Sequence, residues 1–180
     1  MNAFEQLAAS LLTRAGYWVY PSFKVELTKE EKRAIGRHSS PRWEIDLIAY
    51  KPKTDELLVV ECKAYLDSGG VQLASFQKPK NDRYKLFNEP KLREVVFSRL
   101  TQQLVEAGSV IEGTKVRLAL MAAKIKPKEH ADIVELFKQN EWYLFDASWI
   151  REHLRHLSDG SYENDVPSVV AKLLLREANV

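Results

Sequence analysis

Residues 42–65 read RWEIDLIAYKPKTDELLVVECKAY and contain the two strands around which the rest of the chain is organised. The first expected strand, residues 42–50, alternates, with Glu44 and Asp46 on one face. The opposite face carries apolar side chains, at Ile45, Leu47 and Ala49. The KPKTD segment then breaks the pattern. The second expected strand, residues 56–65, is a nearly continuous apolar run, which is typical of a strand buried on both faces.

The buried strand ends in two charged residues. Glu61 and Lys63 share one face of it, and Cys62 between them points into the core. Antiparallel pairing of the two strands would place Asp46 beside Glu61 and Lys63. Two adjacent carboxylates repel each other unless a cation lies between them, and oxygen ligands favour Mg²⁺ or Mn²⁺ over Zn²⁺. We therefore predict a metal site at Asp46 and Glu61 for phosphodiester hydrolysis, with Lys63 orienting or deprotonating the attacking water or steadying the developing charge.

The spacing of these residues resembles the PD-(D/E)xK nuclease superfamily, in which an acidic residue on one strand precedes (D/E)-x-K on the next. Here Asp46 is followed, after fourteen residues, by Glu61-Cys62-Lys63, although Ile45 replaces the proline of the motif. The resemblance implies an α/β, restriction endonuclease-like αβββαβ core with a central mixed sheet flanked by helices. We expect this core over residues 1–147 and a C-terminal helical extension over residues 148–180.

The same resemblance implies a metal-dependent endonuclease that acts on nucleic acid, with DNA preferred over RNA. Its catalytic residues would be Asp46, Glu61, Lys63 and a glutamate on the opening helix, Glu5. The alternative is a non-catalytic nucleic-acid-binding or assembly module that retains the nuclease fold. A site that has lost its catalytic activity is expected to lack at least one motif residue, whereas Asp46, Glu61 and Lys63 are all present. In a structural interpretation, the strand charges would instead be a solvated face and a cross-strand ion pair.

The opening helix is predicted from an apolar stripe that ends at Gly16, a C-cap residue. The stripe consists of Phe4, Leu7, Ala8, Leu11, Leu12 and Ala15. Glu5 lies at its edge. Its carboxylate either reaches toward the metal pocket or is a first-turn glutamate favoured by the helix dipole.

Two polar segments are candidates for contact with phosphates. Residues 28–41 are expected to form a solvated loop with several cations. In residues 66–93, basic and aromatic side chains are interleaved, a pattern that suits phosphate contact and base stacking. The predicted nucleic-acid-binding residues are Lys78, Lys80, Arg83 and Lys85. The aromatic residues Phe76, Tyr84 and Phe87 either stack on bases or anchor the segment to the core.

The second half of the chain predicts a crossover to a parallel strand. Helices are expected at 92–107 and 127–139, and strands at 115–123 and 141–146, with Asp146 or Ser148 capping the next helix. Gln102 or Gln103 could support the lysine, although surface glutamine is the plainer explanation. The closing helix at 168–178 either packs on the core or pairs two subunits, so a homodimer is possible.

Composition sets the outer limits. The formal charge is +2 and the pI about 8.5, so any nucleic-acid surface must be local. Cys62 is the single cysteine, which excludes an internal disulfide framework and fits a reducing compartment. No apolar run approaches the ~20 residues of a membrane span. We expect a cytoplasmic globular protein.

Overall fold

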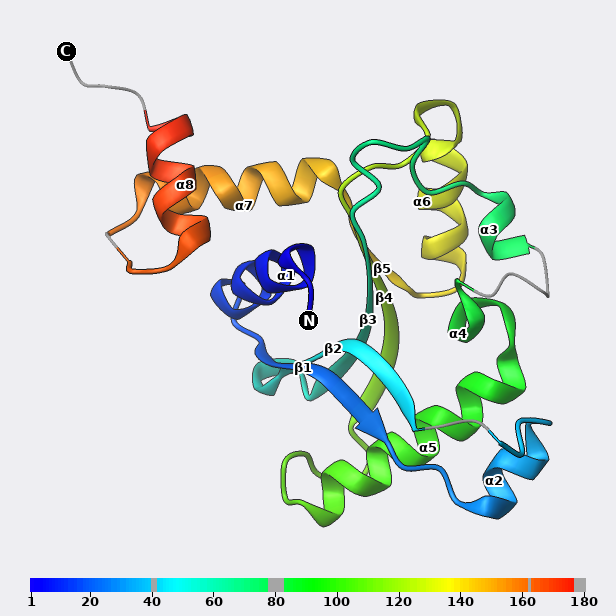
Figure 1. The fold of residues 1–180 in the computed structure, drawn as a ribbon. Coiled ribbons are helices and arrows are strands. Elements are labelled where there is room, and N and C mark those ends of the chain that lie inside the picture. Colours follow the sequence, from blue (N-terminus) through cyan, green and yellow to red (C-terminus); the bar gives the residue numbers. More distant parts are fainter. Residues whose placement is uncertain (40–41, 78–82, 162, 177–180) are drawn as a thin grey trace.

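A five-stranded mixed sheet forms the centre of the protein. The computed structural model describes residues 1–39, 42–77, 83–161 and 163–176. The strand order in the sheet is the order in the sequence (Figure 1). The strands are β1 (Trp18–Val25), β2 (Trp43–Lys51), β3 (Glu56–Lys63), β4 (Lys115–Ala122) and β5 (Tyr143–Phe145). β1, β2 and β3 pair antiparallel, and β3, β4 and β5 pair parallel. The predicted crossover to a parallel strand is confirmed.

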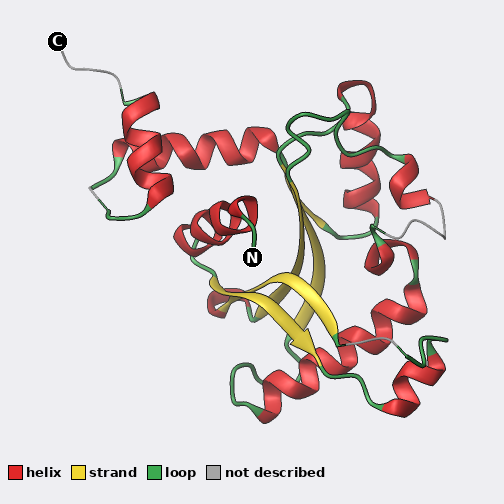
Figure 2. Cartoon of the chain, in the orientation of Figure 1, coloured by secondary structure: helices red, strands yellow, loops and turns green. Residues whose placement is uncertain are grey.

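Helices cover both faces of the sheet (Figure 2). The helices are α1 (Ala3–Arg14), α2 (Lys29–Ala34), α3 (Ala74–Gln77), α4 (Lys85–Asn88), α5 (Pro90–Glu106), α6 (His130–Gln139), α7 (Ala147–Asp159) and α8 (Val166–Leu175). One-turn 3₁₀ helices at Pro52–Thr54 and Pro127–Glu129 precede β3 and α6. The chain is therefore α/β, with a mixed sheet between two helical layers.

Each face of the sheet has its own apolar core. On one face, α5 and α6 pack over alternate residues of β3 and β4, such as Val59 and Leu118. On the other face, α1 and α7 pack over Val60 and Met121. β3 is covered on both faces, which explains its unbroken apolar sequence. Of the two caps that the sequence allows, Asp146 and Ser148, it is Asp146 that caps α7, accepting from the backbone N–H groups of Ser148 and Trp149.

The polar segment after β1 is not simply a loop. Thr28 begins α2 with a capping box, in which its hydroxyl accepts from the Glu31 N–H and the Glu31 carboxylate accepts from the Thr28 N–H. Arg99 on α5 then binds the Glu31 carboxylate at 3.0 Å. The prediction of a loop missed this T-x-x-E capping box. The ion pair between Glu31 and Arg99 holds α2 against α5.

The aromatic side chains of the segment after β3 anchor it to the core. Phe76, Tyr84 and Phe87 are buried and pack edge to face with one another. Phe76 also packs against Phe137 of α6. Of the two roles left open for these rings, anchoring to the core is confirmed. Across the described ranges, no helix is long and apolar enough to cross a lipid bilayer.

Candidate active site

Asp46 lies at an interruption of the β1–β2 pairing. Pro21 pairs with Leu47 and Phe23 with Ile45, and the intervening Ser22 has a φ of 49°, in the left-handed region. The register is the same on both sides of this point, so neither strand has an extra residue, but the left-handed backbone at Ser22 interrupts the extended conformation and side-chain alternation does not continue across it. Ile45 consequently packs on the α5 side and Leu47 on the α1 side. The predicted regular alternation, with both on one face, is therefore wrong.

This interruption directs Asp46 toward β3. Its Oδ2 accepts a hydrogen bond from the Cys62 N–H at 2.8 Å. The regular β2–β3 pairing begins only at Leu47 and Val60, so beyond that point a side-chain carboxylate takes the place of a main-chain acceptor. The aspartate is thus fixed beside the Glu61-Cys62-Lys63 segment.

β3 presents Glu61 and Lys63 at its carboxyl end. Lys63 Nζ donates a hydrogen bond to Glu61 Oε1, and the two side chains form an ion pair. The Lys63 ammonium also lies 5.7 Å from the centre of the Tyr84 ring, within reach of a cation–π contact. Cys62 is buried among the α1-side core residues, as predicted. Burial raises the pKa of its thiol, which argues against a nucleophile at this position.

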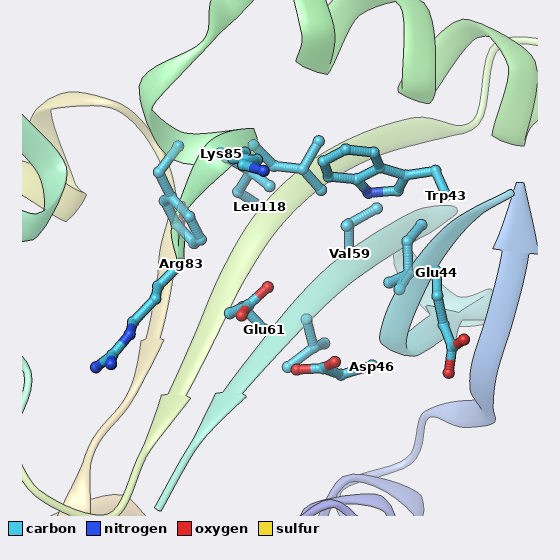
Figure 3. A pocket seen from close by; sticks show the side chains of 12 residues that line it. Trp43, Glu44, Asp46, Val59, Glu61, Arg83, Lys85 and Leu118 are labelled. Atoms are coloured by element: carbon cyan, nitrogen blue, oxygen red, sulfur yellow. The ribbon is translucent and has the colours of Figure 1, made fainter. Parts of the chain in front are cut away.

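Asp46 and Glu61 line one cavity of about 230 Å³. Figure 3 shows both carboxylates in its interior, with Arg83 to one side and Trp43 and Glu44 to the other. Glu44 is exposed, and its carboxylate is turned away from Glu61 in this view. The cavity therefore combines an acidic floor with basic and aromatic walls.

The electrostatics of the site disfavour two bare carboxylates. Burial, with repulsion from Glu5 and Glu44, raises the pKa of Asp46 despite the Cys62 N–H and Lys63. Burial and repulsion from Asp46 likewise raise the pKa of Glu61, although Lys63 opposes both. Burial lowers the pKa of Lys63, but the Glu61 carboxylate outweighs this and holds that pKa above its usual range. A cation held between the two carboxylates would offset their mutual repulsion and favour their charged forms.

The donor set suits a hard divalent cation. Two carboxylates in one cavity match the sparse protein ligation of Mg²⁺, which usually keeps several waters. In the part of the chain that the structure describes, no three His, Cys, Asp or Glu side chains converge to hold a metal. Asp46 and Glu61 are the two carboxylates of this cavity that could hold Mg²⁺ or Mn²⁺, with water and substrate completing the shell.

Glu5 lies on α1, on the other side of the sheet from α5. Its carboxylate accepts from the Asn2 N–H at 2.9 Å and completes a capping box with the Asn2 side chain. Its charge raises the pKa of both Asp46 and Glu61. Glu5 thus takes the first-turn position and also contributes to the site's field, and its catalytic role stays a prediction.

The predicted nucleic-acid-binding residues are partly brought to the site. Arg83 and Lys85 line the same cavity as the carboxylates. Arg83 donates to the Tyr65 hydroxyl at 3.4 Å. Lys78 and Lys80 lie outside the described residues. The two glutamines on α5 are bonded elsewhere, Gln102 to Glu106 and Gln103 to the Glu26 N–H, and do not line this cavity.

Trp43 is a cavity residue that sequence reasoning missed. The Arg37 guanidinium lies 5.4 Å from the centre of its ring, and Glu89 holds that guanidinium through two hydrogen bonds of 2.9 Å. The sequence feature that could have indicated Trp43 as a site residue is its position only three residues before Asp46. Alternation puts Trp43 and Ile45 on one face, and the cavity opens on that face.

Comparison with known proteins gives no further constraint: no protein-family model, no curated protein and no solved structure matches the chain.

Proposed function

We propose that the chain is a metal-dependent endonuclease of the PD-(D/E)xK type, which hydrolyses phosphodiester bonds and prefers DNA. One observation carries the proposal. Asp46 and Glu61 share a cavity where β2 leaves β3, and the Lys63 ammonium is bonded to Glu61. Two half-buried carboxylates that line one cavity, one held by a main-chain N–H group and the other by an ammonium, are typical of a functional site rather than of a solvated surface.

The roles follow from the donors. Asp46 and Glu61 are the residues that would hold Mg²⁺ or Mn²⁺, and the cation supplies charge neutralisation at the phosphate and a more acidic water. Because Glu61 raises its pKa, Lys63 is a cation at neutral pH. Lys63 then suits donation of a hydrogen bond to the attacking water or to a phosphate oxygen better than removal of a proton.

The walls of the cavity suit a nucleic-acid strand. Arg83 and Lys85 supply positive charge beside the carboxylates, as phosphate binding requires. Trp43 supplies an aromatic ring at the same rim, on which a base or sugar can pack. The formal charge of the whole chain is only +2, so this local grouping matters more than overall charge.

The deciding experiment is a cleavage assay on supercoiled, branched and single-stranded DNA and on RNA, with Mg²⁺ or Mn²⁺ against EDTA. We expect metal-dependent cleavage that Lys63→Ala greatly reduces and Lys24→Ala leaves unchanged. Lys24 is the matched control because it is an exposed lysine on β1. Wild-type protein that binds DNA but cleaves none of these substrates would instead support the non-catalytic module.

A further inference from the structure

The outer face of α8 is an apolar stripe exposed to solvent. Val166, Leu173 and Leu174 are 75%, 78% and 76% exposed, and Val170 between them is also exposed. Their spacing of four, three and one residues places all four on one face of a helix. Figure 1 shows α8 against the C-terminal part of α7, away from the sheet.

The opposite face of α8 fixes this orientation. Ser168 and Ala171 are buried against the rest of the protein. Arg14 of α1 bonds to Asp165 at 2.6 Å and to the Ser168 hydroxyl at 3.1 Å. Lys172 donates to the carbonyl of Ser158 at 3.2 Å. The helix therefore cannot turn its stripe inward without breaking these bonds. A contiguous apolar face exposed to solvent usually marks an interaction surface, so we expect another surface to cover it.

We propose that the stripe is covered by the α8 helix of a second copy of this chain, antiparallel to the first, with the two-fold axis close to Val170. In this arrangement Val166 of one copy faces Leu174 of the other, and the same patch serves both copies. The stripe from Val166 to Leu174 spans about 12 Å of helix, and its apolar residues lie on both sides of its centre.

Charge complementarity selects the second copy and the antiparallel direction. The acidic residues Glu163 and Asp165 flank the N-terminus of α8, and the exposed Arg176 follows its C-terminus. Antiparallel pairing places Arg176 opposite residue 164 of the other copy, between that copy's two acids. The Glu163 side chain is 58% exposed and can accept a further donor while it binds Arg14. Parallel pairing would bring like charges and like helix dipole ends together.

The first test is the mass of the full chain in solution, by sedimentation equilibrium. We expect a particle of twice the 20.7 kDa chain mass that dissociates on dilution. Leu174→Glu should weaken association at least about 100-fold, because symmetry removes two buried leucines and adds two buried charges. Val134→Glu on α6 is the control, since Val134 is another exposed apolar side chain on a helix. Circular dichroism checks that each variant is folded.

A second test uses the single cysteine. Cys62 is buried, so a cysteine introduced at position 170 is the accessible thiol. Val170→Cys should crosslink two copies under mild oxidation, because residues at the axis meet their own copies. Val166→Cys should not, since two such positions lie about 12 Å apart along the helices, beyond disulfide reach.

Four results would overturn the proposal. They are a monomeric wild type at about 100 µM or above, a dimer that Leu174→Glu leaves intact, equal crosslinking at both positions, and a monomer that sediments with phosphatidylcholine–phosphatidylserine vesicles. None of these results depends on cleavage, so the dimer and the nuclease proposal stand or fall separately.

Discussion

Asp46→Asn should stabilise the protein while it removes the metal site. The asparagine Oδ1 can still accept the Cys62 N–H bond, so the main change is the loss of a charge. The pKa of Asp46 is raised overall, so burial and the repulsion from Glu5 and Glu44 outweigh the Cys62 bond and Lys63. Removal of the charge should therefore raise the free energy of unfolding at pH 8 by about 1 kcal/mol. For a domain of this size, that shifts Tm by roughly 2–4 °C.

The sign of the pH dependence follows from the direction of the shift. An aspartate in the unfolded chain has a pKa of about 3.9, and that of folded Asp46 is higher. The folded wild type therefore binds more protons than the unfolded chain as pH rises from about 4 through the folded pKa, and the Asp46 contribution to stability falls over this window. The advantage of Asp46→Asn should be absent below about pH 4 and complete above the folded pKa.

Urea unfolding in EDTA between pH 4 and pH 8 measures this difference. Glu135→Gln, an exposed carboxylate on α6, serves as the control and should stay within about 0.5 kcal/mol of wild type. With 10 mM Mg²⁺ and a Kd of about 1 mM, wild type should gain about 1.4 kcal/mol, and Asp46→Asn should gain far less. An Asp46→Asn protein less stable than wild type at pH 8 in EDTA, or an advantage independent of pH, would refute the reasoning.

Lys63→Ala should lower the cleavage rate by on the order of 10²- to 10³-fold while DNA affinity, measured by fluorescence anisotropy, stays close to wild type; a comparable loss of affinity would make Lys63 a binding residue. Replacing Arg83 and Lys85 with alanine should weaken DNA binding and flatten its salt dependence by roughly 0.9 per lost phosphate contact, as a titration from low to high salt would show. Unchanged affinity at every salt concentration would remove both residues from the substrate surface. Arg117→Met should destabilise the fold by about 1–3 kcal/mol in urea unfolding, because the buried Glu56 loses the guanidinium 2.9 Å away and keeps only the Tyr143 hydroxyl as a donor. A loss below about 1 kcal/mol would show that Glu56 does not need this partner.

The order of the elements could be predicted from local patterns. The apolar run of β3, the stripe of α1 and the Asp146 cap of α7 are each written in a few consecutive residues, and each is confirmed. Adjacent elements in the chain are also neighbours in the sheet, so short-range patterns sufficed for the topology. Boundaries moved by a few residues, as in α8, which begins at Val166 rather than at residue 168.

Features that depend on contacts between distant residues were not predictable. The interruption at Ser22 and Asp46 arises where β1 pairs with β2, and the sequence of either strand alone does not predict it. Alternation within β2 therefore predicted the wrong face for Ile45. The pairing of Asp46 with the Cys62 N–H needs both the interruption and the end of the β2–β3 ladder. The Glu56–Arg117 ion pair, between neighbouring parallel strands, was missed for the same reason.

The hydrogen bond from Cys62 to Asp46 makes one amide proton a reporter of the whole pocket. The chain contains a single cysteine, so growth on ¹⁵N-cysteine would yield one backbone cross-peak in a proton–nitrogen correlation spectrum. The chemical shift of an amide proton depends strongly on the charge of the oxygen that accepts it. The position of this peak should therefore change when Asp46 gains a proton or a cation is bound, and no chemical probe has to be attached to the protein. Titration of this peak would measure cation affinity directly, and candidate oligonucleotides could be ranked by their effect on it before any substrate is known to be cut.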